Sequence, residues 1–96
     1  MAIRSFTKPE LKEFFETGKV PKKAEWQGVK KIVARKLDVL AYAHVLDDLK
    51  SPPGNHLEAL KDDLKGLHSI RVNDQWRIVF EWTPQGAAQV RIMDYH

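Results

Sequence analysis

Two arginines on neighbouring predicted strands are the first residues whose positions suggest chemistry. Apolar and aromatic residues hold every second position of Trp76–Trp82, which places them on the core face of a strand and Arg77 on the opposite face. A three-residue turn at 73–75 pairs Val72 with the first tryptophan of this run and sets Arg71 directly opposite Arg77. A two-residue turn would instead separate the two arginines.

Two like charges side by side on paired strands are unfavourable by a few tenths to about 1 kcal/mol. Either a nearby carboxylate relieves the repulsion, or the pair binds an anion. Planar guanidinium groups suit phosphate oxygens well. We therefore expect Arg71 and Arg77 to form an anion site.

The last strand of the chain alternates in the same way. Val90 and Ile92 fit the core face. The residues expected on the face of the arginine pair are Arg91, Met93 and Tyr95, whereas Asp94 and His96 lie towards the other side. An ordinary frayed chain end is the alternative interpretation of Asp94, Tyr95 and His96.

A basic stretch precedes the sheet. Residues 19–36 hold seven lysines and arginines against the single acid Glu25. Lys30, Lys31 and Arg35 are its candidates for contact with RNA or phosphate. A solvated helix face, or a surface for an acidic partner, explains the same pattern.

The elements that position these residues begin with a predicted strand at Ala2–Phe6. Thr7, with Glu10 three residues later, predicts a capped helix that ends near Gly18. Apolar residues at intervals of three and four predict a second helix. This second helix is predicted at Glu25–Tyr42, and a further short helical turn at His44–Lys50. We expect no helix in Ser51–Asn55, which contains two prolines and a glycine.

Four strands follow. They are predicted at Leu57–Leu60, Leu67–Val72, Gln75–Thr83 and Ala87–Tyr95, joined by short polar or glycine-containing links. One strand, then helices, then a run of strands is typical of an α+β domain. We expect two to three helices packed on one face of a twisted, mostly antiparallel sheet.

Composition narrows the class of protein. Ninety-six residues, 43% of them hydrophobic and 30% charged, form one folded domain over residues 1–96. The absence of cysteine excludes a thiol nucleophile and a cysteine-based zinc site, and we expect no metal or cofactor. No apolar run spans a membrane and the start lacks a signal-peptide pattern, so we expect a cytoplasmic location and no membrane partner. The formal net charge of +3 favours an anionic partner such as nucleic acid.

Five segments resemble a known family over almost the whole chain. They are Ile3–Phe6, Ser51–Asn55, Leu57–Lys61, His68–Arg77 and Asp94–His96. Together they are similar to the HigB/GraT-like branch of the RelE/ParE toxin superfamily. The specific feature is the combination of Ser-Ile-Arg-Val-Asn-Asp-Gln-Trp-Arg with a terminal Asp-Tyr-His.

The resemblance implies a RelE-like fold and a toxin of a type II toxin–antitoxin system. It implies a metal-independent endoribonuclease (an mRNA interferase) that cuts messenger RNA in the decoding site of the 70S ribosome and inhibits translation. The implied partner is a helix-turn-helix HigA-type antitoxin, through which alone the toxin reaches operator DNA. The RNA 2′-hydroxyl attacks the adjacent phosphate, and the 5′-oxygen leaves.

This reaction needs a base near the 2′-oxygen, an acid near the leaving oxygen, and cations for the charge that builds on phosphorus. Arg71 and Arg77 are the expected charge stabilisers, with Lys61 a third. Tyr95 can stack on a base or move a proton. His96 can act as acid or base near neutral pH, and Asp94 can orient it or act itself.

The sequence departs from the family at one position. Some HigB toxins carry a catalytic histidine immediately before a Pro-Leu-Lys segment, and here that position is Glu58. Glu58 could act as base, or the change permits a slower nuclease. His56 shares its face in a regular strand and is either its substitute or a solvated loop residue. By parity His68 faces the core, where we expect a structural role.

Two other functions are weighed against the nuclease. One is a ParE-like toxin that binds DNA gyrase without cutting RNA. The other is an inactive toxin that acts as corepressor with its antitoxin. Proton-transfer groups clustered beside paired arginines favour the nuclease, whereas Glu58 favours the corepressor.

Overall fold

The computed structural model describes residues 3–94. Its α-helices are α1 (Pro9–Thr17) and α2 (Lys30–Tyr42), and its strands are β1 (Glu58–Ala59), β2 (His68–Arg71), β3 (Trp76–Thr83) and β4 (Gly86–Asp94). Four 3₁₀ turns lie between them: η1 (Gln27–Val29), η2 (Leu46–Lys50), η3 (Pro53–Asn55) and η4 (Asp62–Leu64). No helix among residues 3–94 is long and apolar enough to cross a membrane.

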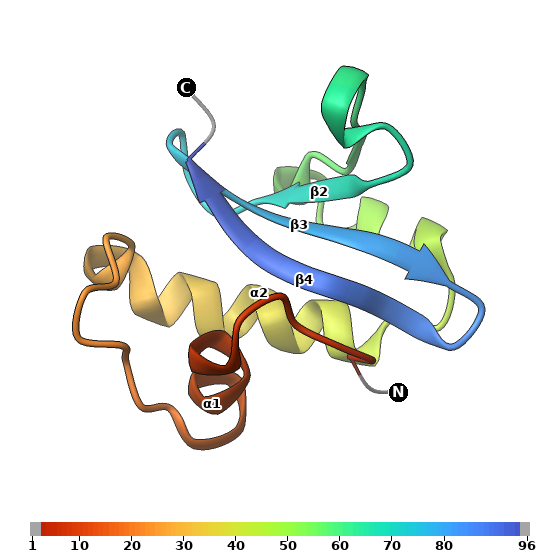
Figure 1. The fold of residues 1–96 in the computed structure, drawn as a ribbon. Coiled ribbons are helices and arrows are strands. Elements are labelled where there is room, and N and C mark those ends of the chain that lie inside the picture. Colours follow the sequence, from red (N-terminus) through yellow and green to blue (C-terminus); the bar gives the residue numbers. More distant parts are fainter. Residues whose placement is uncertain (1–2, 95–96) are drawn as a thin grey trace.

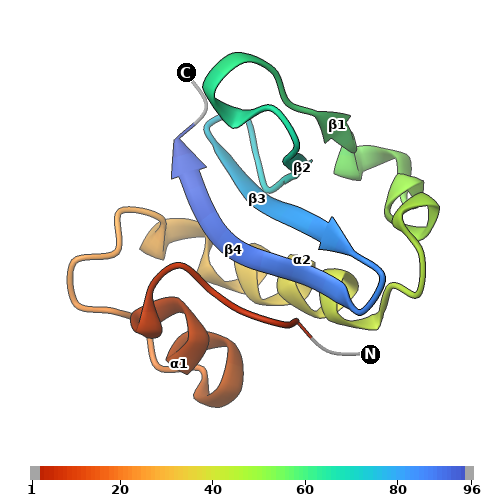
Figure 2. The ribbon, with the colours of Figure 1, turned by 45° about the vertical axis from the view of Figure 1, so that its right-hand side comes forward.

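The strands form one antiparallel sheet in the order β1-β2-β3-β4. The sheet is twisted, and α1 and α2 lie on the same side of it (Figures 1 and 2). This arrangement confirms the α+β class predicted from the order of the elements.

The core lies between the helices and one face of the sheet. Leu37 and Leu40 of α2 are almost fully buried there, as are Ile70 of β2 and Ile78 and Phe80 of β3. The alternation predicted for β3 is confirmed, because Trp76, Ile78 and Phe80 belong to this core and Trp82 packs against it, whereas Val79 does not belong to it. Burying such side chains stabilises the fold by about 1.5–3 kcal/mol each.

The N-terminal segment runs beside β4 (Figures 1 and 2), but the predicted strand is reduced to one parallel bridge between Phe6 and Val90. The amide of Val90 donates to Ser5 O at 3.0 Å, and Val90 O accepts from the amide of Thr7 at 3.1 Å. Pairing ends there because α1 begins at Pro9, which has no N–H to donate. Ala2 lies outside the described residues.

The first helix differs from its predicted start. Lys8 is the N-cap and makes no side-chain capping bond, so the expected Thr7 cap is wrong. Pro9 at the first helical position favours the start of the helix instead, because its fixed φ already has a helical value. The predicted stop is confirmed: Gly18 adopts φ +82° and its N–H donates to Phe14 O at 2.8 Å.

The second helix begins at Lys30, five residues later than predicted. The chain before it bends so that Trp26 packs edge-on against Phe14, with ring centroids 4.9 Å apart. The turn at Gln27–Val29 contains Gly28, a poor helix former. Tertiary packing of the tryptophan therefore overrides the helical period here.

Candidate functional site

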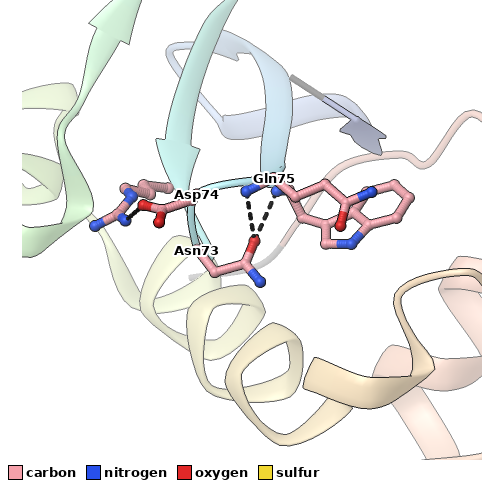
Figure 3. A network of polar contacts seen from close by, with 5 residues as sticks. Asn73, Asp74 and Gln75 are labelled. Atoms are coloured by element: carbon pink, nitrogen blue, oxygen red, sulfur yellow. Dashed lines mark hydrogen bonds and ion pairs between the residues drawn. The ribbon is translucent and has the colours of Figure 1, made fainter. Parts of the chain in front are cut away.

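The turn between β2 and β3 sets the position of the arginine pair. The side-chain oxygen Oδ1 of Asn73 accepts hydrogen bonds from the amides of Gln75 and Trp76 at 2.9 and 2.7 Å (Figure 3). This Asx turn spans residues 73–75, and the amide of Val72 donates across it to Trp76 O at 2.9 Å. The resulting register places Arg71 opposite Arg77, as predicted.

Arg77 is buried, with 7% of its surface exposed. Its Nε donates to Ser69 Oγ at 2.7 Å, and its Nη2 donates to the carbonyl oxygen of His56 at 2.5 Å. The carboxylate of Glu58 lies 3.9 Å from the same Nη2. A cation taken out of water needs such partners, because burying it without them is costly. The guanidinium is thus held in one orientation by two strands and a loop.

Arg71 is more accessible, with 36% of its side chain exposed, and it forms an ion pair with Asp74 at the turn (Figure 3). Glu58 is the acidic side chain near Arg77, and half of it is exposed. The repulsion between the two arginines was expected to be relieved by a nearby carboxylate or used to bind an anion. The structure places the carboxylates of Asp74 and Glu58 near them. The anion site stays a prediction.

The register defines which residues share the arginine face. Arg77 pairs with Met93, and Val79 pairs with Arg91, so both β4 side chains lie on this face as predicted. Asp94 pairs with Trp76 and therefore lies on the other face, where its Oδ2 accepts a hydrogen bond from Gln75 Nε2 at 3.0 Å. Tyr95 and His96 lie outside the described residues.

Lys61 and His56 flank β1. Lys61 is exposed beside Glu58 at a shallow hollow of about 340 Å³. His56 has left-handed backbone at φ 44°, because it ends the η3 turn, so the expectation of a regular strand shared with Glu58 is wrong. The predicted break of all helix at Ser51–Asn55 is likewise wrong for its last three residues.

The basic residues of the second helix lie elsewhere. Lys30, Lys31 and Arg35 are exposed along α2, which packs against the opposite face of the sheet from Arg77. The structure therefore does not bring them into the arginine cluster. His68 pairs with Phe80 and stacks on its ring with centroids 6.2 Å apart, as expected of a core-face histidine.

Sequence reasoning missed three residues around the site. Ser69 holds Arg77 and could have been found by parity, because it lies two residues before Arg71 on the same face. Buried Asn55 accepts a hydrogen bond at Oδ1 from Lys36 Nζ. Burial, followed by the charges of Arg35 and Arg71, lowers the pKa of Lys36. No sequence pattern signals this contact between α2 and a loop.

A metal centre finds no support in the described part of the chain. Residues 3–94 contain no group of three or more histidine, cysteine, aspartate or glutamate side chains that could hold a metal ion. The charged groups that the described residues place here are the guanidinium groups of Arg71 and Arg77 and the exposed carboxylates of Glu58 and Asp74.

Comparison with known proteins identifies the family. Residues 4–96 match the family model described as the RelE-like toxin HigB of type II toxin–antitoxin systems. This chain belongs to the HigB family of RelE-like toxins. It is 38% identical to Toxin HigB-1 of Vibrio cholerae serotype O1 over 86 residues, which cover 90% of this chain and 88% of that protein.

Two further proteins are similar to this chain. An uncharacterized protein of Haemophilus influenzae is 44% identical over 52 residues, covering 54% of this HigB-family chain and 52% of that protein. A YoeB–YefM complex from Staphylococcus aureus contains a chain with TM-score 0.55 and 18% identity, with 100% of this chain and 99% of that chain covered. At this identity the structural likeness shows the fold alone.

Proposed function

We propose that this HigB-family toxin is a ribosome-dependent endoribonuclease that cleaves mRNA and thereby inhibits translation. The observation that carries the proposal is the arginine pair at Arg71 and Arg77, with the Glu58 carboxylate 3.9 Å from the second guanidinium. Cations that are fixed before the reaction stabilise the charge that develops on phosphorus without reorganisation. The family placement supports the same activity.

The proposed reaction needs no group beyond RNA and protein. A base removes the proton of the RNA 2′-hydroxyl, whose oxygen forms a bond to the adjacent phosphorus. The bond from phosphorus to the 5′-oxygen breaks, and an acid gives that oxygen a proton. Arg71 and Arg77 neutralise the phosphate oxygens, and Lys61 is a third cation for them. The acid and base come from Glu58 and the end of the chain, Asp94 to His96.

The proposed partners are an antitoxin of the helix-turn-helix HigA type, the 70S ribosome and mRNA. Operator DNA is reached only through the antitoxin. The solved YoeB–YefM complex supports an antitoxin partner, because there a chain of the same fold occurs in a complex. The net charge of +3 and the exposed lysines of α2 suit ribosomal RNA or an acidic protein surface.

Induced expression with mapping of new mRNA 5′ ends tests the function. We expect growth arrest and codon-phased cuts from the wild type, and loss of both from Arg71→Ala and Tyr95→Ala at normal protein levels. Arg71 is chosen because 36% of its side chain is exposed and it lies on the face of the sheet away from the core, so its loss spares the core. Lys12→Ala, which removes an exposed lysine of α1, is the matched control and should cut like the wild type.

The other outcomes identify the alternatives. Arrest without cuts contradicts the nuclease and points to a binder of the gyrase-directed kind. Absence of arrest from well-expressed wild type points to an inactive toxin that serves as corepressor.

A further inference from the structure

The loop between η2 and β1 contains an asparagine whose side-chain amide makes three hydrogen bonds. Asn55 has none of its surface exposed. Its Nδ2 donates to Leu49 O and Ser51 O, both at 3.2 Å, and its Oδ1 accepts from Lys36 Nζ of α2. A buried amide with three hydrogen bonds fixes the backbone around it, since another conformation would leave buried polar atoms without these partners.

His56, the residue after this asparagine, contacts Arg77. His56 adopts left-handed backbone at φ 44°, its N–H donates to Pro53 O at 3.1 Å, and its carbonyl oxygen accepts from Arg77 Nη2 at 2.5 Å. A non-glycine residue in this conformation is strained by roughly 1 kcal/mol or more and persists only where its surroundings impose it. Asn55 is the adjacent residue that imposes it, because its side chain ties the loop to two carbonyls and to α2.

Lys36 sets the direction of the amide. An ammonium group can only donate, so it selects Oδ1 and turns Nδ2 towards the two loop carbonyls. The lowered pKa of Lys36, caused first by burial, agrees with an ammonium group drawn out of water to make this contact. A continuous set of contacts thus runs from α2 through the loop to the buried guanidinium.

We propose that Asn55 is a positioning residue for Arg77: it holds the loop so that the His56 carbonyl fixes the guanidinium, and Lys36 orients its amide. The effect on RNA cleavage rests on the proposed nuclease function. The effect on Arg77 itself does not depend on that function.

The test uses Asn55→Asp, which keeps the shape and the acceptor for Lys36 but removes the Nδ2 donor. Hydrogen exchange of arginine side-chain N–H groups, followed by ¹⁵N NMR on the full chain, is the readout. Loss of the bond to the His56 carbonyl should make the Nη2–H of Arg77 exchange about tenfold faster, because that N–H is the donor to this oxygen. Arg91, whose Nε donates to Gln89 O at 3.1 Å, is the internal reference and should not change.

Asn73→Asp is the matched control. Asn73 also holds a loop, but only through its acceptor Oδ1, which aspartate keeps, so Arg77 exchange should stay at the wild-type rate. In a ribosome-dependent cleavage assay, Asn55→Asp should lower kcat about tenfold with little change in KM. Adding Arg77→Lys should then cost less than it does in the wild type, because the two changes act on the same group.

Unchanged Arg77 exchange in folded Asn55→Asp overturns the proposal. If that variant does not fold, Lys36→Met takes its place. It leaves the asparagine intact, and a several-fold faster Arg77 exchange supports the proposal while an unchanged rate overturns it. Absence of cleavage by the wild type refutes the nuclease alone, because the exchange of Arg77 is still measured.

Discussion

The hydrogen bond between Ser69 and Arg77 should contribute measurably to stability. Ser69 has none of its surface exposed, and its Oγ accepts from Arg77 Nε at 2.7 Å. Ser69→Ala leaves a buried, charged N–H without its acceptor, which costs about 1.5–3 kcal/mol. With a urea m-value of about 1.5 kcal/mol/M for a chain of this size, the unfolding midpoint should fall by about 1–2 M. Urea titration followed by tryptophan fluorescence measures this shift.

A double-mutant cycle isolates the bond from other effects. In an Arg77→Met background the same Ser69→Ala change should cost less than about 0.5 kcal/mol, because no charged donor remains. Thr17→Val is the matched control: it removes an exposed hydroxyl that donates to Glu13 O at 2.9 Å, and it should cost less than about 0.5 kcal/mol. Equal costs for Ser69→Ala in both backgrounds would refute the assigned role of the hydroxyl.

Three further outcomes are expected. The amides of His44 and Val45 lower the pKa of Asp48, so its stabilising effect is complete above its ordinary pKa and is lost as the pH falls through the lowered one. The thermal midpoint of wild type should exceed that of Asp48→Ala at pH 7 and converge with it once the pH has fallen below the lowered pKa of Asp48; a constant gap in pH-dependent melting would contradict this sign. Gly18→Ala should destabilise by about 1 kcal/mol in urea titration through its φ of +82° rather than through crowding, because no atom lies within 4 Å of the added Cβ. An equally stable variant would show that the helix end adapts. Phe80→Ala should cost about 3–5 kcal/mol by the same assay, since the ring is fully buried, and a loss under 1 kcal/mol would mean that the core collapses around it.

The sheet could be predicted from sequence because its strands carry a strong period of two. Burying every second residue from Trp76 to Trp82 decides which face of β3 points to the core. The Asn73 turn then sets the register of β3 against β2. The opposition of Arg71 and Arg77 was predicted for a three-residue turn, and the structure has this register rather than that of the two-residue alternative.

The partners of the arginine pair could not be predicted in the same way. Arg77 bonds a carbonyl oxygen 21 residues away in sequence, on a loop whose backbone shape depends on a contact with α2. Such contacts follow from tertiary packing and leave no periodic signal. The start of α2 was predicted too early for the same reason, because Trp26 leaves the helical path to pack on Phe14.

The bridge between Phe6 and Val90 also bears on when the protein becomes complete during its synthesis. Ser5, which leaves the ribosome well before β4, accepts a hydrogen bond at its carbonyl oxygen from the amide of Val90, and its hydroxyl accepts one from the amide of Gln89, 84 positions later. Translation releases the chain from its N-terminus, so the β2–β3–β4 meander must emerge before the first segment has an edge to join. A nascent chain therefore cannot assume its finished form while β4 is still inside the ribosome.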